Sequence, residues 1–173
     1  MIKCLTDINI GSVIQMSIFT RLHKQTACIS AITDGKVIRL ENISDQAFAN
    51  QMVGDGIAIE INQDTIYAPC AGVVSMIAPT KHAFTIRADN EAEILVHIGL
   101  QHNLNEHHFD YHVNVDDTVN PDTAIVSLSD EAKEMLQQGL VVVIVVLNYQ
   151  AHPIQTRTTA ANVIRGKKLF TCR

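Results

Sequence analysis

The chain of 173 residues carries a formal net charge of −5, and 47% of its residues are hydrophobic while only 18% are charged. This length predicts one domain with its own core, and the composition excludes a disordered chain and a coiled coil. Because no basic cluster is present to neutralise a run of phosphates, we expect no nucleic-acid partner.

Residues 1–25 are the least patterned part of the chain, and we expect them to form an N-terminal arm ahead of a domain over residues 26–173. The arm lacks the long apolar segment and small-residue cleavage site of a secretory signal. The longest apolar run, Leu140–Leu147, is far shorter than the roughly 20 residues of a membrane-spanning helix. We therefore place the protein in the cytoplasm, without direct insertion into a membrane.

Short runs rich in β-branched residues recur between turn signals along the rest of the chain. In order they read "ACISAI", "GKVIRL", "GIAIEI", "TIYAP", "GVVSMI", "AFTIRA", "EILVHI", "TAIVSL", "VVVIVVL" and "AANVIRG". Two other segments predict short helices: "SDQAFANQM", which starts from Ser44, and "SDEAKEMLQQG", with Ser129 as its cap and Gly139 as its stop. The pattern predicts a mostly β, antiparallel, sandwich- or barrel-like single domain with one or two short helices.

Four cysteines, Cys4, Cys28, Cys70 and Cys172, are far apart in the sequence and form no CxxC pair. A metal cluster or a disulfide framework would show closer, paired spacing. We therefore expect the cysteines to be small buried hydrophobic residues of a protein from a reducing compartment.

Two histidines stand in a predicted hairpin, "TKHAFTIRADNEAEILVHIG", over residues 80–99. A two-residue turn at Asp89 and Asn90 would pair His82 with His97, and directly opposed side chains share a face with Cβ atoms about 4.5–5.5 Å apart. The hairpin therefore predicts two imidazoles side by side. A shift of one residue in the register would send them to opposite faces.

A second group of histidines, in "QHNLNEHHFDYH", invites a metal-binding hypothesis because neutral imidazole is a common transition-metal ligand. The group consists of His102, His107, His108 and His112. The stretch has no helical apolar stripe, and no HExxH motif supplies the base of a zinc hydrolase. Between a metal site and a solvated loop we favour the loop.

The middle of the chain, residues 31–99, resembles the IIA domain of the glucose family of the bacterial phosphoenolpyruvate-dependent sugar phosphotransferase system. The resemblance rests on landmarks in the family's order and spacing: Asp34-Gly35, "VGDGIAI", "APCAGVV", "TKHAF" and "ILVHIG". The C-terminal third matches weakly, through "VVVIVVLN" and "VIRG". An "APxxG" turn also occurs in biotin and lipoyl carriers, but Lys81 lacks the flanking methionines of a biotinylation site.

The resemblance implies that His97 carries a phosphoryl group, that His82 is its partner and that the Thr80 hydroxyl orients His82. Imidazole suits this role because its pKa of about 6.5 leaves one ring nitrogen free to attack phosphorus at neutral pH. Backbone N–H groups at residues 97–99 could add hydrogen-bond donors, and Gly99 would permit close approach of a phosphate. The chemistry requires no metal and no other cofactor.

The same resemblance implies two protein partners, the histidine phosphocarrier protein as donor and a sugar-specific IIB domain as acceptor. A shallow apolar face would receive them, with Phe48, Val53 and Phe84 as candidates. Val53 and Phe84 fit a core position equally well, so Phe48 is the preferred candidate.

Several positions depart from the family pattern. Gln101 and His102 stand where the family usually has Asp and Thr, and Glu91 and the aspartates Asp116 and Asp122 replace glycines. Aspartate tolerates the left-handed conformation, so we expect the fold to survive. The alternative to a phosphoryl carrier is a regulatory or degenerate homologue that binds partners without efficient phosphoryl relay.

Overall fold

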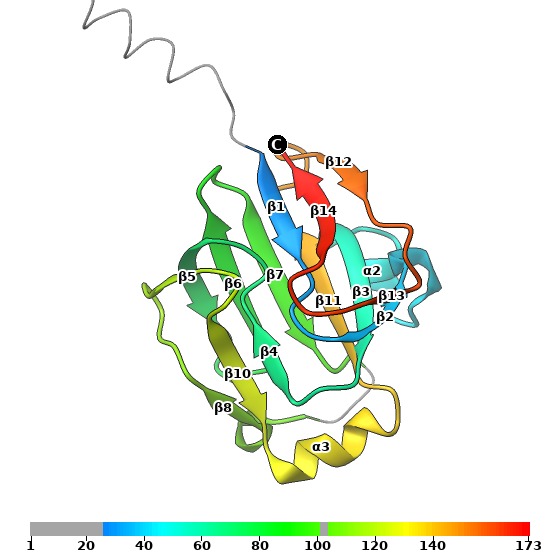
Figure 1. The fold of residues 1–173 in the computed structure, drawn as a ribbon, viewed down its shortest axis with the longest axis vertical. Coiled ribbons are helices and arrows are strands. Elements are labelled where there is room, and N and C mark those ends of the chain that lie inside the picture. The colour runs from blue at the N-terminus through cyan, green and yellow to red at the C-terminus, as the bar shows by residue number, and fades with distance from the viewer. Residues whose placement is uncertain (1–25, 101–103) are drawn as a thin grey trace, which may run out of the picture.

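The computed structural model describes residues 26–100 and 104–173 (Figure 1). The predicted arm over residues 1–25 therefore lies outside the described part. The strands are β1 (Ala27–Ser30), β2 (Gly35–Ile38), β3 (Asp55–Ile61), β4 (Thr65–Tyr67), β5 (Gly72–Ile77), β6 (Ala83–Ala88), β7 (Glu93–Ile98), β8 (Phe109–Tyr111), β9 (Thr118–Val119), β10 (Ala124–Leu128), β11 (Val141–Val146), β12 (Ile154–Arg157), β13 (Asn162–Val163) and β14 (Lys168–Cys172). The helices are α2 (Gln46–Ala49) and α3 (Asp130–Leu136), with 3₁₀ turns η1 (Leu40–Asn42) and η2 (Glu106–His108).

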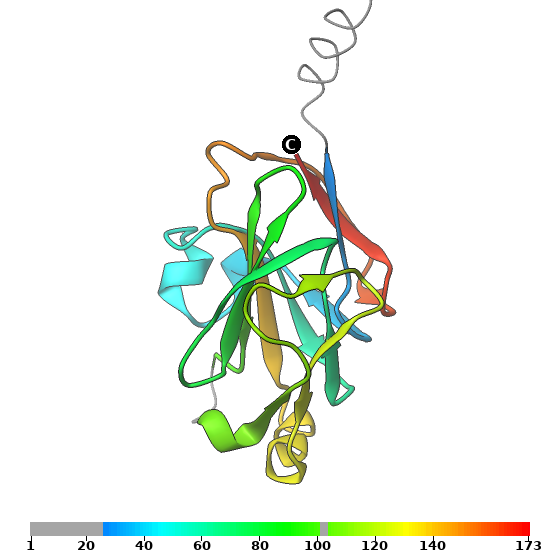
Figure 2. The same cartoon turned by 90° about the vertical axis from the view of Figure 1, so that its left-hand side faces the viewer.

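The strands form one large antiparallel sheet and two small ones. The large sheet has the order β13-β2-β3-β11-β7-β6-β5-β9, and the small sheets are β1-β14-β12 and β4-β10-β8. Seen from the side, β1 and β14 cover one face of the large sheet and α2 lies on the other (Figure 2). The prediction of a mostly antiparallel β-sandwich with short helices is confirmed.

The cap of helix α2 lies one residue after Ser44, from which the sequence predicted the helix to start. The cap is Asp45, whose carboxylate accepts hydrogen bonds from the backbone N–H groups of Ala47 and Phe48. Helix α3 follows the prediction, because the Ser129 side chain accepts from the Ala132 N–H. The chain then turns at Gly139, whose φ of +84° is favourable for glycine. No helix in the described part of the chain is long and apolar enough to span a membrane.

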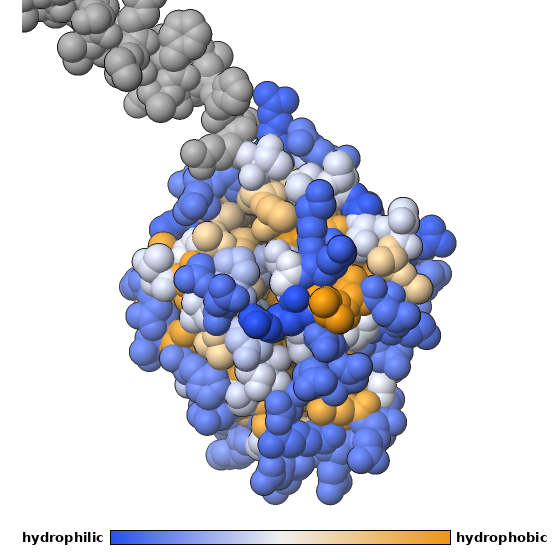
Figure 3. Space-filling view, viewed as in Figure 1, coloured by the Kyte–Doolittle hydropathy of each residue, from blue (hydrophilic) through white to orange (hydrophobic). Residues whose placement is uncertain are grey.

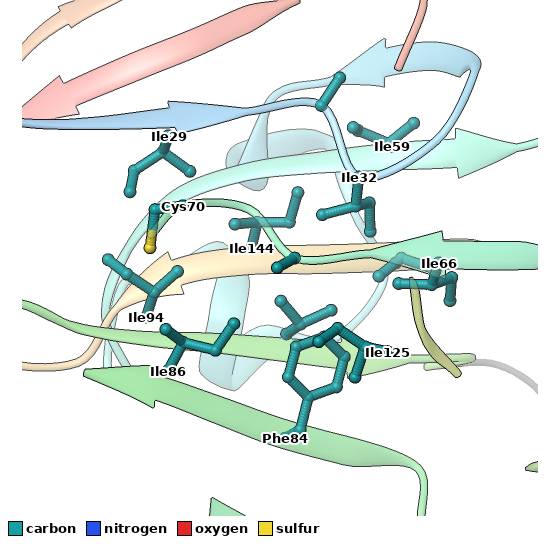
Figure 4. Packing of buried hydrophobic residues seen from close by; sticks show 14 of the residues in the cluster. Ile29, Ile32, Ile59, Ile66, Cys70, Phe84, Ile86, Ile94, Ile125 and Ile144 are labelled. Carbon is teal, nitrogen blue, oxygen red and sulfur yellow. The ribbon is translucent and has the colours of Figure 1, made fainter. Parts of the chain in front are cut away.

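The core lies between the large sheet and the two small sheets, and aliphatic side chains fill it (Figure 4). Alternation along β11 shows how the sheet divides its side chains: Val142 and Ile144 belong to this core, whereas Val143 and Val145 belong to a second cluster beneath α2. Both faces of β11 are covered, which explains why its sequence is apolar without a break.

The second cluster, on the face that we call the outer face of the large sheet, is smaller. Its buried members are Leu40, Ile43, Phe48, Ala58, Ala83, Leu95, Val143 and Val145. The opposite side of the molecule, formed around β1 and β14, is mostly hydrophilic with separated apolar patches (Figure 3).

The cysteines only partly follow the expectation of burial. Cys70 and Cys172 are buried, but Cys28 is exposed, and Cys4 lies outside the described residues. Cys28 stands next to the buried Ile29 on β1, and successive side chains of a strand point to opposite faces.

Candidate functional site

The hairpin of β6 and β7 carries both candidate histidines, but its register differs from the prediction by one residue. The turn is a three-residue loop in which Glu91 has φ +68° and the Ala88 N–H donates to the Ala92 carbonyl. A left-handed third residue is typical of three-residue hairpin loops. His97 therefore stands opposite Ala83 and not opposite His82.

The two imidazoles nevertheless lie together, with ring centroids 4.8 Å apart and an interplanar angle of 66°. The reason is that His82 precedes β6 and so escapes the strict alternation of the strand. Lys81, directly before it, has φ +59°, and the Ala78 N–H closes the tight turn by donating to the Ala83 carbonyl. The predicted pairing was wrong, while the predicted proximity of the rings is found.

Thr80 holds the orientation of His82. Its Oγ1 lies 2.5 Å from Nδ1 of His82, within the same turn. This contact leaves Nε2 as the only nitrogen of His82 free to bond another group, and the ring lies edge-on to His97.

His97 occupies a half-buried position against the cluster beneath α2. Its ring lies 5.5 Å from the Phe48 ring, centroid to centroid, in an edge-on arrangement. Burial, and to a smaller extent a charge on His82, lower the pKa of His97 from its ordinary 6.5 to about 4, while Asp45 acts in the opposite direction. This imidazole is therefore uncharged at neutral pH.

One nitrogen of His97 is enclosed. Nδ1 is buried and has no hydrogen-bond partner within the described part of the chain. A buried polar group without a partner costs about 1–3 kcal/mol, so the fold bears a cost to keep a histidine here.

Asp45 is a site residue that the sequence did not reveal. Its carboxylate caps α2 and also acts electrostatically on His97. An Asp at the start of a helical segment is a recognisable capping signal, but its proximity to a histidine 52 positions later follows only from the packing of α2 on the sheet.

The candidates for an apolar docking face are placed in different ways. Phe48 is only 5% exposed and contacts His97 from within the cluster, and Val53 is half-buried at the edge of the same cluster. Phe84 has no exposed surface and points into the main core beside Ile125 (Figure 4). The prediction that Phe84 contacts a partner is wrong, because the alternation of β6 turns its side chain inward.

The backbone donors proposed near Gly99 are already engaged. The Ile98 N–H donates to the His82 carbonyl, and the Gly99 N–H donates to the Val141 carbonyl. Gly99 has φ +79°, and a Cβ there would lie 2.2 Å from Leu104 Cδ1. Gly99 is therefore required by the turn and by Leu104, and its N–H is not free to bind a phosphate.

The histidine-rich segment disperses its side chains. His107 lies near Glu106, His108 Nδ1 accepts from the Asn105 N–H, and His112 Nε2 is 2.8 Å from Ser127 Oγ. His102 lies outside the described residues. Across residues 26–100 and 104–173, no group of three His, Cys, Asp or Glu side chains is arranged to hold a metal.

Two of the family departures adopt the conformation that a glycine would favour. Glu91 and Asp116 have φ values of +68° and +74°, whereas Asp122 is not among the residues with positive φ. Gln101 and His102 lie outside the described residues.

Comparisons with known proteins identify the family to which this fold belongs. The family described as phosphoenolpyruvate-dependent sugar phosphotransferase system, EIIA 1, matches residues 27–152. The glucose-specific EIIA component of Halalkalibacterium halodurans is 33% identical over 144 residues, which cover 83% of each chain. A glucose-specific EIICBA component of Streptococcus pneumoniae is 47% identical over 72 residues, 42% of this chain and 10% of that protein.

A solved structure shares the architecture. The glucose permease IIA of Mycoplasma capricolum superimposes with a TM-score of 0.75 at 28% identity, covering 85% of this chain and 96% of that one. With the family match over residues 27–152, the chain belongs to the EIIA 1 family of the phosphoenolpyruvate-dependent sugar phosphotransferase system.

Proposed function

We propose that this protein is a phosphoryl carrier, which accepts a phosphoryl group on His97 from the histidine phosphocarrier protein and passes it to a sugar-specific IIB domain. The observation that carries the proposal is the pair of imidazoles, whose ring centroids lie 4.8 Å apart. The Thr80 hydroxyl contacts Nδ1 of one of them, His82. In a member of a sugar phosphotransferase family, this pair is the natural place for phosphoryl chemistry.

Burial selects the reacting nitrogen of His97. Nδ1 is enclosed, so Nε2 is the nitrogen that can meet a phosphoryl group on another protein. For Nε2 to present its lone pair, the single proton of the neutral ring resides on Nδ1. The lowered pKa keeps the ring in this neutral, nucleophilic form at neutral pH.

His82 stabilises the group in transit. If the Thr80 hydroxyl donates to Nδ1 of His82, then Nε2 carries the proton and donates to a phosphoryl oxygen above His97. A bond forms between phosphorus and His97 Nε2 while the bond to the donor's histidine nitrogen breaks. Such transfers depend mainly on in-line positioning and on stabilising charge on the equatorial oxygens.

The family context supports the choice of partners and compartment. The name of the Streptococcus pneumoniae relative joins an A component to B and C components in one protein, which fits a IIB domain as acceptor. A component that takes its phosphoryl group from a phosphoenolpyruvate-dependent relay works in the cytoplasm, where we place this protein. The alternative is a regulatory or degenerate homologue, which the Gln101 and His102 departures keep open.

Intact-mass spectrometry tests the proposal. The protein is incubated with phosphoenolpyruvate, the first enzyme of the system and the histidine phosphocarrier protein, and then treated with acid. We expect an acid-labile gain of one phosphoryl group in the wild type and none in His97→Gln. His82→Gln should accept more slowly or fail in onward transfer, because the nucleophile remains while stabilisation is lost.

Two results would contradict the assignment. Normal acceptance by His97→Gln would mean that another residue is the nucleophile. No gain in the wild type, with a phosphocarrier from the same organism, would favour the regulatory homologue.

A further inference from the structure

A groove of about 630 Å³ opens on the outer face of the large sheet, beside the histidine pair. Its floor and walls include apolar side chains, and two glutamates reach into it. The residues used below are the apolar Ile38, Ile43, Leu100 and Val141 and the acidic Glu41 and Glu60.

The groove begins close to His97. Val143 is the cross-strand neighbour of His97. Val141 lies two residues before Val143 on β11, about 6.6–6.8 Å from it along the strand. Odd-numbered residues of β11 face the outer side, so Val141 and His97 are displayed on one surface. Leu100, three residues after His97 and just beyond the end of β7, also lines the groove.

The groove is acidic, and one of its carboxylates lacks a partner. Among the described residues that line it, none is a lysine, arginine or histidine. Glu41 is 3.3 Å from Arg39 at the exposed rim. Glu60 is half-buried and forms no ion pair or side-chain hydrogen bond within the described residues, although Lys36 stands opposite it in the register.

The Glu60 carboxylate lies beside the turn at Gly139. A Cβ at Gly139 would lie 3.6 Å from Glu60 Cδ, so the carboxyl group lies directly beside this turn. The turn follows the C-terminus of α3, where backbone carbonyls add further negative character. The described lining therefore offers acceptors and apolar walls, and Lys36, which stands opposite Glu60 in the register, forms no ion pair with it.

A protein that docks over His97 must cover this groove. A standard interface buries about 800 Å² on each partner, a patch with a radius of roughly 16 Å, and the groove begins well within that distance of His97. Covering a carboxylate removes it from water, which is costly unless a cation or a strong donor replaces the water. A cation or strong donor on the docking protein would replace that water at Glu60.

We propose that the groove receives an arginine side chain of the protein that docks over His97. The aliphatic stem of arginine would pack on Ile38, Ile43 and Leu100, and its planar fork would bind the Glu60 carboxylate through two hydrogen bonds. Only the identity of the docking protein, the histidine phosphocarrier, rests on the proposed function.

Substitution of Glu60 separates binding from chemistry. Steady-state transfer from the phosphorylated phosphocarrier protein is measured for Glu60→Gln and for Asp89→Asn, a control with the same charge change on the exposed hairpin turn. We expect Glu60→Gln to raise KM about tenfold with little change in kcat, the loss of a charge-assisted hydrogen bond. Asp89→Asn should leave KM within about twofold. Equal KM values for the two variants would overturn the proposal.

A second experiment tests whether the groove binds a guanidinium group, even if no phosphoryl transfer occurs. Ethylguanidinium, the head and short stem of arginine, is titrated into ¹⁵N-labelled wild type and Glu60→Gln, with uncharged ethylurea as the matched probe. Saturable shifts of the Gly139 amide in the wild type, lost in Glu60→Gln and absent with ethylurea, support an arginine site. Failure of ethylguanidinium to shift Gly139, or equal shifts with ethylurea, would overturn it whatever the fate of the phosphoryl-carrier proposal.

Discussion

The two faces of the large sheet are built from the same strands but meet different demands. The inner face presents aliphatic side chains that fill the main core without interruption. The outer face carries a smaller apolar cluster, with His97 at its edge and two buried polar atoms, Thr85 Oγ1 and His97 Nδ1, that have no partner in the described residues. The inner face stabilises the fold, whereas the outer face lowers its stability by leaving two buried polar groups without partners.

The two faces show which surroundings keep a histidine neutral in this fold. Enclosure by the outer cluster removes His97 from water and holds it neutral, which a fully exposed surface would not do. The inner core has to offset this cost, because net stability is a small difference between large terms and a cost of this size is a large share of it. The site depends on the core that lies behind it.

The largest predicted effect comes from truncating a phenylalanine on each face. Phe84→Ala should lower the free energy of unfolding by about 3–5 kcal/mol, because it empties a fully buried position of the main core. Phe48→Ala should cost less, roughly 2–3 kcal/mol, since the outer cluster is smaller and close to solvent. Urea unfolding monitored by circular dichroism measures both.

The same pair of variants distinguishes support from function. Phe48→Ala should also raise the pKa of His97 toward its ordinary value, because water would reach the ring. Phe84→Ala, studied where it is still folded, should leave that pKa close to its wild-type value. If the two variants shifted it alike, the outer cluster would not be what controls His97.

The pKa of His97 measures how strongly its surroundings disfavour protonation. We expect its ring to protonate near pH 4, where an unfolded chain would protonate near 6.5. Between these values the unfolded state binds more protons, so the contribution of this group to stability falls as the pH drops through that window. Ring resonances followed by NMR from pH 7 to pH 3 report the value.

Two neighbours should move this pKa in opposite directions. His82→Gln removes a charge that disfavours protonation, so the pKa of His97 should rise, whereas Asp45→Asn removes a favourable charge, so it should fall. Asn is also a good helix cap, so α2 should persist in the second variant. An unchanged pKa in both variants would mean that burial alone governs His97.

The sequence predicts the inner face well and the outer face less well, for a physical reason. Alternation in segments such as "EILVHI" is a local property and indicates the core positions directly. The burial of Phe48 and its contact with His97 depend on α2 folding onto a sheet built from distant strands. A phenylalanine on a short helix carries no local sign of which way it will face.

The hairpin shows the same limit within a single motif. Its existence and the meeting of its histidines were predicted, but the register was not, because the left-handed residue of the loop is Glu91 where a glycine would have marked it. The local turn at Lys81 then brought His82 beside His97 in spite of the shifted pairing. When an unusual residue type holds the left-handed position of a turn, hydrophobic periodicity does not reveal that turn.

The smallest predicted effect tests that turn. Glu91→Gly should raise the free energy of unfolding by about 0.5–1 kcal/mol, because a non-glycine residue at φ +68° is strained and its ion pair with Arg87, at 4.0 Å, is exposed and weak. Asp117→Gly is the matched control: its φ is not positive and its carboxylate accepts from the Asn114 N–H, so the same change should destabilise. The midpoint of thermal unfolding is measured for both variants. A lower midpoint for Glu91→Gly than for the wild type would contradict the idea that Glu91 is strained in this loop.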